Sequence, residues 1–211
     1  MNDSLYYCGE RRELCSYLPT FYSKVLEIGC GAGGFRSNLD LQHEYWGVEP
    51  TDNIANEAAN KLDRVLHGTY EQVSSQLPEQ YFDLIICNDV IENMLDPESF
   101  MRSVRSKLSS NGVIVGSIPN VRFLLNLYEL LADKDWRYKD SGILDRTHLR
   151  FFTEKSILRL FNENSFRVEH FSGVNVYHGI GIKNQLLAFF AKLILGRDVG
   201  AMHFIFRLSN V

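Results

Sequence analysis

Residues 25–34, which read V-L-E-I-G-C-G-A-G-G, constrain the fold of this chain more than any other run. A short, mostly apolar strand leads directly into Gly29, Gly31 and Gly33, and the residues after them can begin a helix. Glycines let the backbone approach a ligand closely, and the free amides at a helix N-terminus can bind a polar or anionic group. The run therefore predicts a strand, a turn and a helix with a ligand bound at the turn.

The rest of the chain alternates between short apolar runs and longer amphipathic stretches. This alternation predicts an α/β fold, in which helices cover both faces of the sheet. We expect seven strands, at residues 24–28, 45–49, 64–67, 82–88, 112–118, 166–173 and 201–208. We expect helices at residues 11–20, 33–40, 53–62, 97–108 and 153–162, and an amphipathic helix at 184–195.

Length and composition favour a single domain spanning residues 1–211 and exclude several classes of protein. The chain has 211 residues, 45% of them hydrophobic, and a formal net charge of -4, which argues against a nucleic-acid partner. Its four cysteines suggest neither a zinc site nor a disulfide framework. The first residues do not read as a signal peptide, and the longest apolar stretch, 186–195, is about half of the roughly 20 residues that a transmembrane helix needs. We therefore expect a cytoplasmic protein without a transmembrane segment.

The alternation loosens between residues 120 and 152. This stretch is rich in aromatic and charged side chains, and long insertions of this kind in a compact domain usually form a lid or a binding loop. We expect it to form the side of the site that binds the second substrate.

A second acidic residue narrows the class of ligand expected at the glycine turn. Glu49 ends the next strand in the run G-V-E-P, where a carboxylate is suited to bind two ribose hydroxyls. The ligand is therefore expected to contain adenosine. The glycine spacing differs from the G-x-G-x-x-G of dinucleotide-binding folds, although a Rossmann-like domain that binds another nucleotide is an alternative.

With Glu27 before it, the glycine turn resembles the first motif of the class I S-adenosylmethionine-dependent methyltransferases, E/D-x-G-x-G-x-G. The resemblance extends over nearly the whole chain, through residues 47–50, 82–93, 96–97, 111–120 and 145–153. The last two segments resemble a bacterial subgroup associated with surface-glycan assembly. The resemblance implies a seven-stranded, mostly parallel, Rossmann-like sheet with an antiparallel last strand, and S-adenosylmethionine as the cofactor.

The resemblance also implies which residues bind that cofactor. Glu27 and the turn of Gly29, Cys30, Gly31 and Gly33 would face its methionine moiety, and Glu49, followed by Pro50, would bind its ribose. Gly68 and Thr69 would lie next to the adenine, where many relatives carry an acid in place of Thr69.

Asn88 and Asp89 end the fourth strand. By the resemblance they would lie beside the methionine end of the cofactor and the methyl group that is transferred. The alternative is that they only form a turn or a helix cap, since Asn and Asp favour such positions.

No metal is predicted. Asn93 stands where relatives commonly carry a histidine, and Glu92 alone is a poor site for a hard divalent cation, which needs several oxygen ligands.

His148 is the candidate general base, and Asp145 three residues before it could orient the imidazole ring. The alternative is that Asp145, Arg146 and His148 only hold the insertion in place. We expect the other histidines to be structural or exposed.

The class of acceptor is inferred from the insertion, where arginines and aromatic rings alternate. Arginine binds phosphate or carboxylate and aromatic rings stack on sugars, which favours a glycan, nucleotide-sugar or lipid-linked acceptor. A solvated charged loop is the alternative.

Helix 184–195 is expected to be a core or homodimer helix, or to make peripheral membrane contact.

The expected function is O-methylation of a sugar or glycan intermediate. The alternatives are methylation of a phenol or quinone precursor, and a non-catalytic cofactor-binding partner of another enzyme.

Overall fold

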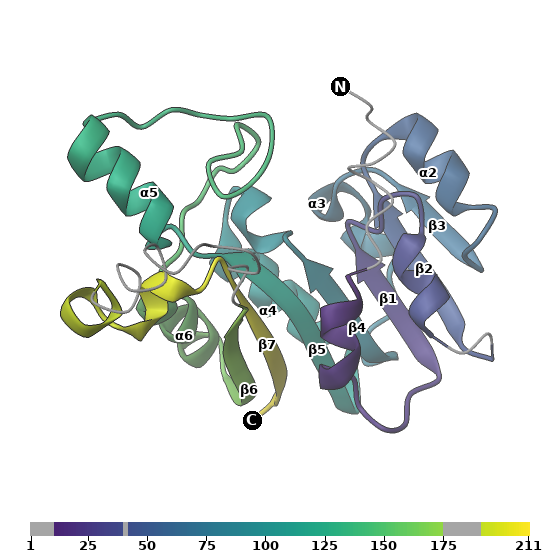
Figure 1. Ribbon diagram of the computed structural model, residues 1–211. Helices are drawn as coiled ribbons and strands as arrows, with labels where there is room; N and C mark the ends of the chain where they lie inside the picture. Colours follow the sequence, from purple (N-terminus) through teal and green to yellow (C-terminus); the bar gives the residue numbers. More distant parts are fainter. Residues whose placement is uncertain (1–10, 40–41, 175–190) are drawn as a thin grey trace.

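The computed structural model describes residues 11–39, 42–174 and 191–211 (Figure 1). They form a seven-stranded sheet in the order β3-β2-β1-β4-β5-β7-β6. Strand β7 lies between β5 and β6 and is antiparallel to both, whereas the other neighbouring strands are parallel. The predicted mostly parallel sheet with an antiparallel last strand is confirmed. The strands are β1 (Lys24–Ile28), β2 (Glu44–Glu49), β3 (Arg64–His67), β4 (Phe82–Asn88), β5 (Leu108–Pro119), β6 (Phe166–Val174) and β7 (His203–Asn210).

The central strand β4 shows why these runs form strands. Its side chains alternate between the two faces of the sheet, so that Leu84 and Ile86 join one buried cluster and Ile85 and Cys87 join the other. Because both faces are covered, the strand reads as an unbroken apolar run rather than as alternating apolar and polar residues.

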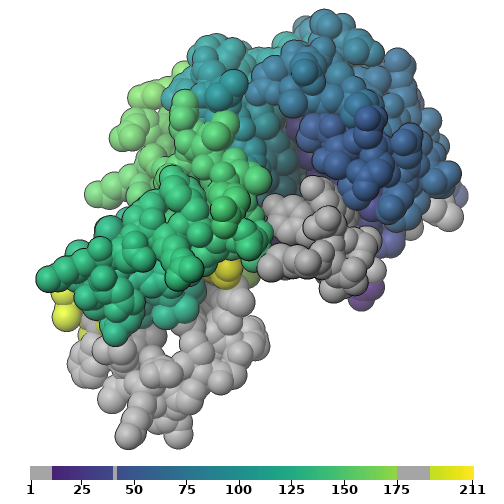
Figure 2. Space-filling view, turned by 90° about the horizontal axis from the view of Figure 1, so that it is seen from above, coloured from purple at the N-terminus to yellow at the C-terminus, as the bar shows by residue number. Residues whose placement is uncertain are grey.

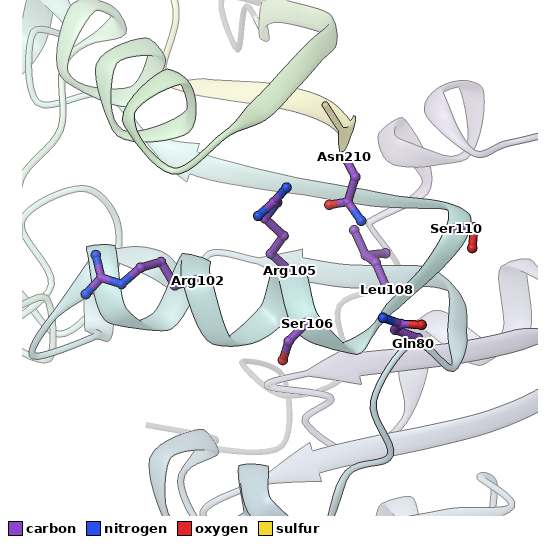
Figure 3. Close-up of a pocket in the computed structure, with 7 residues that line it drawn as sticks. All are labelled: Gln80, Arg102, Arg105, Ser106, Leu108, Ser110 and Asn210. Atoms are coloured by element: carbon purple, nitrogen blue, oxygen red, sulfur yellow. The ribbon is translucent and has the colours of Figure 1, made fainter.

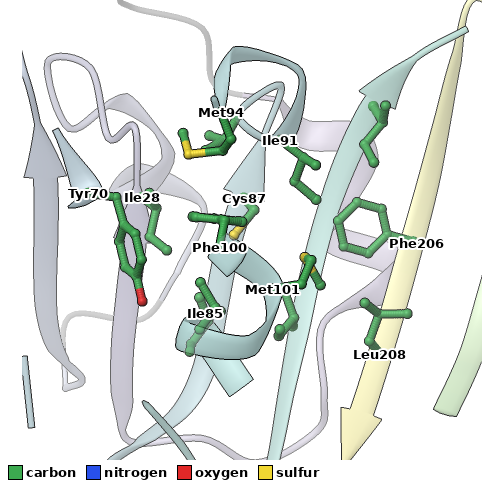
Figure 4. Close-up of a cluster of buried hydrophobic side chains, with 14 of the residues drawn as sticks. Ile28, Tyr70, Ile85, Cys87, Ile91, Met94, Phe100, Met101, Phe206 and Leu208 are labelled. Carbon is green, nitrogen blue, oxygen red and sulfur yellow. The ribbon is translucent and has the colours of Figure 1, made fainter. Parts of the chain in front are cut away.

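Helices cover both faces, as expected. One layer contains α3 (Tyr70–Val73), α4 (Pro97–Lys107) and α6 (Glu154–Glu163), which bury side chains with β1, β4 and β7; Figure 4 shows part of this cluster. The opposite layer contains α2 (Asp52–Ala58) and two short 3-10 helices, η1 (Arg12–Tyr17) and η2 (Gly34–Asn38).

The ends of the longer helices follow from capping residues. Asp96 accepts a hydrogen bond from the backbone N–H of Ser99 at 2.9 Å and Pro97 begins α4, while Thr153 and Ser156 cap α6 reciprocally. These two helices lie within one residue of their expected bounds.

Other helices are shorter than expected. The segments predicted at 11–20 and 33–40 form only η1 and η2, each next to a residue with positive φ, namely Arg11 and Gly33. α2 ends at Ala58, after which the N–H of Asn60 bonds the carbonyl three residues back and the helical spacing is lost. Several short elements were not predicted, among them α3, η3 (Ser74–Gln76) and η4 (Ile91–Asn93).

The first and last residues of the insertion at 120–152 lie next to each other. Asn120 and Phe152 form a parallel bridge, and the N–H of Val121 donates to the carbonyl of Phe152 at 2.9 Å. Between them lie α5 (Leu124–Tyr128) and a single π-helical turn, η5 (Glu129–Asp133). In Figure 2 the insertion forms one side of the visible face and the region of α2 forms the other.

The expected helix at 184–195 lies mostly outside the described residues. Residues 191–195 are helical, with Leu193 67% and Ile194 81% exposed, and η6 (Arg197–Gly200) follows. Its roles in a dimer, in the core or at a membrane stay predictions. Every helix of the described residues is too short or too polar to reach across a bilayer.

Candidate functional site

The predicted site residues meet at one edge of the sheet. The glycine turn follows β1, Glu49 ends β2, Gly68 follows β3 and Asn88 ends β4, and these four strands are parallel neighbours in the order β3-β2-β1-β4. The crevice at the carboxyl ends of parallel strands is where α/β folds bind their ligands.

The glycine turn has a backbone that only glycine adopts without strain. Gly29, Gly31 and Gly33 have φ of 70°, 50° and 73°. The N–H groups of Gly29 and Cys30 donate to the carbonyl of Val48 at 2.8 and 3.1 Å, which holds the turn against β2.

Glu49 links this turn to the loop after β2. Its carboxylate is 3% exposed and accepts hydrogen bonds from the backbone N–H of Gly31 at 3.0 Å and of Thr51 at 2.9 Å. A carboxylate has about four acceptor positions, so Glu49 can still bind two hydroxyl groups.

Glu27 is buried below the turn. Its Oε2 accepts a hydrogen bond from the hydroxyl of Tyr45 at 2.8 Å. Burial and the neighbouring charge of Glu49 raise the pKa of Glu27 to about 8, although the Tyr45 hydrogen bond opposes this. A cation bound beside Glu27 would favour its charged form, so the site is suited to an ammonium or sulfonium group. Sequence reasoning did not identify Tyr45.

The side chain of Cys30 points away from the turn into the core. It packs beneath Gly47, where an added Cβ would lie 2.6 Å from the Cys30 sulfur. Burial raises the pKa of this thiol far above its ordinary value, which makes it unreactive. Only the backbone of Cys30 is available to a ligand.

The segment after β3 is fixed by backbone hydrogen bonds. The N–H of Gly68 donates to the carbonyl of Glu49 at 3.0 Å, and the N–H of Thr69 donates to Oε1 of Gln72 at 2.9 Å at the start of α3. Thr69 is the N-cap residue of this helix. The carbonyl of Pro50 lies 3.1 Å from Nε2 of His67.

Asn88 and Asp89 lie at the end of β4, as expected. Oδ1 of Asn88 is buried without a hydrogen-bond partner, and a buried acceptor of this kind calls for a donor from outside the protein. Asp89 has a positive φ of 53° and its backbone N–H donates to the carbonyl of Ser117 at 3.1 Å.

The carboxylate of Asp89 is the centre of a polar cluster. Arg11 Nη1 lies 2.5 Å from Oδ2, the hydroxyl of Ser117 donates to Oδ1 at 2.7 Å, and His203 Nε2 lies 3.8 Å from Oδ1. Burial raises the pKa of Asp89, but Arg11, His203 and the Ser117 hydrogen bond together hold it below its ordinary value. Asp89 is therefore an anion at neutral pH.

Sequence reasoning missed Arg11, Ser117 and His203. One signal was available for His203. An antiparallel last strand begins at the edge where the parallel strands end, so its first side chain lies at the site. Nothing in the sequence indicated that Arg11 would contact Asp89.

Glu92 and His148 form a second buried pair. Glu92 is 1% exposed with neither carboxylate oxygen hydrogen-bonded, and its Oε1 lies 3.8 Å from Nε2 of His148. Burial and the charge of Asp89 raise the pKa of Glu92 well above its ordinary value. The carbonyl of Ile143 lies 2.9 Å from Nδ1 of His148 and can accept its hydrogen, while Nε2 faces Glu92.

The expectation that Asp145 orients His148 through its carboxylate is wrong. Oδ1 of Asp145 accepts hydrogen bonds from the N–H and the hydroxyl of Thr147, each at 2.8 Å, because the chain turns back on itself there. The imidazole of His148 is held by Ile143 instead.

Several charged side chains of the insertion form ion pairs within the protein. Arg122 pairs with Asp198 at 2.5 Å, Lys139 with Glu129 and Arg146 with Asp140, both at 2.7 Å. The aromatic rings of Trp136 and Phe151 pack edge to face with centroids 5.2 Å apart. These contacts favour the alternative of a charged loop that is held in place by its own ion pairs.

Across the described ranges, no three His, Cys, Asp or Glu side chains gather into a metal-binding group.

A hollow of about 350 Å³ lies at the opposite edge of the sheet and shares no residue with the predicted site. It is lined by Gln80, Arg102, Arg105, Ser106, Leu108, Ser110 and Asn210 (Figure 3). A hollow of about 240 Å³ lies beside the Asp89 cluster, and its lining residues are Arg11, Glu13, Val174, Met202 and His203. The second hollow borders the polar cluster around Asp89, since Arg11 and His203 belong to both.

Comparisons with known proteins show what this chain is similar to. A family model described as "Methyltransferase domain" matches residues 7–171. The mitochondrial ubiquinone biosynthesis O-methyltransferase of Schizosaccharomyces pombe is 28% identical over 160 residues, 72% of this chain and 57% of that protein. The ubiquinone biosynthesis O-methyltransferase of Aliivibrio fischeri strain MJ11 is 26% identical over 164 residues, 74% of this chain and 68% of that protein.

Solved structures share the fold. A crystal structure of a SAM-dependent methyltransferase from Archaeoglobus fulgidus aligns over 99% of both chains with a TM-score of 0.67 and 20% sequence identity. The Rossmann-like sheet predicted from the sequence therefore also occurs in solved structures.

Proposed function

This chain belongs to the family of methyltransferase domains, and from that membership we propose that it is an O-methyltransferase with S-adenosylmethionine as its cofactor. The proposal is carried by Glu49, because its buried carboxylate is fixed by Gly31 and Thr51 and retains acceptor positions for two ribose hydroxyls.

The remaining residues at the edge of the sheet fit the same cofactor. The unpartnered Oδ1 of Asn88 would accept a hydrogen bond from the ammonium of the methionine end, and the backbone of the glycine turn and the carboxyl of Glu27 would line that end. Arg11, which pairs with Asp89 and Glu13, would also face the methionine carboxylate through its remaining N–H groups. Gly68 and Thr69 would contact the adenine, and Pro50 would follow the ribose. When bound, the cofactor supplies an electrophilic methyl group.

The hydroxyl of a phenol or quinone precursor is the acceptor that the relatives favour, since several of them are named for ubiquinone biosynthesis. The sugar or glycan acceptor is the rival. Its support came from the rings and arginines of the insertion, of which Trp136, Arg122 and Arg146 contact other side chains of the protein. A non-catalytic cofactor-binding module is the second rival.

His148, Asp145 and Asp89 are the proposed residues on the acceptor side. For His148 a positioning role is better supported than proton transfer, because its side chain is 7% exposed and both ring nitrogens face protein groups. Asp145 would shape the turn that carries His148, and Asp89 would stabilise positive charge beside the methyl group.

A transfer assay tests this function. The purified protein is incubated with methyl-labelled S-adenosylmethionine and either catechol or methyl glucoside. Label in the catechol methyl ether supports the proposed function, and label in methyl glucoside supports the sugar rival. Binding of the cofactor without transfer to either acceptor supports the non-catalytic module.

A further inference from the structure

The hollow of about 240 Å³ beside Asp89 lies at a defined place in the fold. Val174 ends β6 and His203 begins β7, and these two residues are paired in register across the strands. Pro119, at the end of β5, pairs with His203 from the other side. The hollow therefore opens at the edge of the sheet where β4 and β5 end.

Charged groups surround His203 from several elements. Asp89 comes from the end of β4, Arg11 and Glu13 from the start of the described chain, and His148 from the insertion. Burial and the charges of Arg11 and His148 lower the pKa of His203, and Asp89 and Glu13 oppose this without reversing it. The imidazole is thus uncharged at neutral pH and free to accept a proton.

We propose that this hollow holds the ring of a phenolic acceptor and that Nε2 of His203 takes the proton of the hydroxyl that becomes methylated. The inference rests on the proposed function. Val174 and Met202 provide apolar walls for one aromatic ring, and the polarizable thioether of methionine packs well against such rings.

The step balances as a proton transfer coupled to methyl transfer. S-adenosylmethionine supplies the methyl group, and its carbon–sulfur bond breaks with the electron pair going to sulfur as the acceptor oxygen bonds to the carbon. The hydroxyl proton passes to Nε2 of His203. The imidazolium is stabilised by the carboxylate of Asp89, 3.8 Å away, and releases its proton to solvent, since the His203 side chain is 17% exposed. A phenol has a pKa of about 10, within reach of an imidazole base, whereas a sugar hydroxyl is far less acidic.

Imidazole titration tests the base without cofactor or acceptor. NMR of histidine-labelled protein, with the His203 signal assigned through His203→Gln, should give a pKa below about 6.5. Asp89→Asn should lower that pKa further, because it removes a charge that favours the imidazolium. A His203 pKa above the ordinary value, or no response to Asp89→Asn, would overturn the proposal.

Transfer to catechol tests the role in the reaction. His203→Gln should lower kcat by about 100-fold or more and leave the affinity for S-adenosylmethionine unchanged, and added imidazole should restore part of kcat to His203→Ala. His170→Gln is the matched control, since His170 is exposed on β6, and it should behave as the wild type. Wild-type kcat in His203→Gln overturns the proposal, as does transfer by the wild type to methyl glucoside but not to catechol. Failure of the proposed function itself is distinguishable, because the wild type would then transfer the methyl group to neither acceptor.

Discussion

Arg11 and Asp89 are 78 positions apart in the chain and form an ion pair in which Nη1 lies 2.5 Å from Oδ2. Both side chains are only 27% exposed, and the second guanidinium nitrogen, Nη2, donates to the hydroxyl of Ser117 at 2.7 Å. The pair joins the start of the described chain to the end of the central strand. It thereby fixes the boundary between the proposed cofactor and acceptor sides.

Arg11→Met should destabilise the protein by about 1–3 kcal/mol at neutral pH, because it leaves a partly buried carboxylate without its cation. The pKa of Asp89 is lowered in the folded state, so the stabilisation exists above the unfolded pKa and is lost as the pH falls through the folded pKa. Urea unfolding measured from neutral to acidic pH should show the two proteins converging toward low pH. Arg159→Met, at an exposed position on α6, is the control. An equal loss at all pH values would contradict the assignment.

Glu27→Gln should remove a pH dependence of stability. Because burial raises the pKa of Glu27 to about 8, the folded protein holds a proton that the unfolded chain releases above about 4.5. The free energy of unfolding of the wild type should therefore fall relative to the variant by up to about 1.4 kcal/mol per pH unit between these values.

Urea unfolding of the cofactor-free protein at several pH values checks this dependence. Glu57→Gln, on the exposed side of α2, should keep the wild-type dependence. Parallel stability curves for wild type and Glu27→Gln would show that Glu27 is not held in its neutral form.

Gly47→Ala should destabilise the cofactor-free protein by about 1–3 kcal/mol through overpacking. Its Cβ would lie 2.6 Å from the Cys30 sulfur and 2.7 Å from Cδ1 of Leu62. Adding Cys30→Ala should recover part of this loss, which a double-mutant cycle from urea unfolding would measure. Strictly additive effects would mean that the sulfur and the new methyl group do not meet.

His148→Ala should loosen the insertion. It removes the hydrogen bond to Ile143 and leaves a cavity beside Glu92. We expect faster tryptic cleavage at Lys139 and Arg146 while the free energy of global unfolding changes less, as for local opening. His170→Ala is the control, and unchanged cleavage of His148→Ala would show that the imidazole does not hold this segment.

The sequence alone was sufficient to predict the sheet and the residues proposed to bind the cofactor. The strands at 24–28, 64–67 and 82–88 have the predicted bounds, because an apolar run bounded by turn residues is a local property. Glu49 was identifiable in the same way, from its place at the end of a strand.

The acceptor side depends on contacts that no local pattern encodes. Arg11 meets Asp89 although the two are 78 positions apart in the chain, and the partner of His148 is the carbonyl of Ile143 rather than the nearby carboxylate of Asp145. The helices expected at 11–20 and 33–40 begin one residue late, after positive φ at Arg11 and Gly33, and end early because Leu18 and Leu39 have extended backbone. Tertiary geometry determined these features.

Calorimetric titration with S-adenosylmethionine tests the central claim most directly. The wild type should bind one equivalent, and Glu49→Ala should bind about 10–100-fold more weakly, since hydrogen bonds to a charged carboxylate contribute about 1.5–3 kcal/mol. Glu57→Gln should bind as the wild type does. No heat of binding from the wild type, or equal affinity in Glu49→Ala, would contradict the assignment of the glycine turn and Glu49 as the cofactor site.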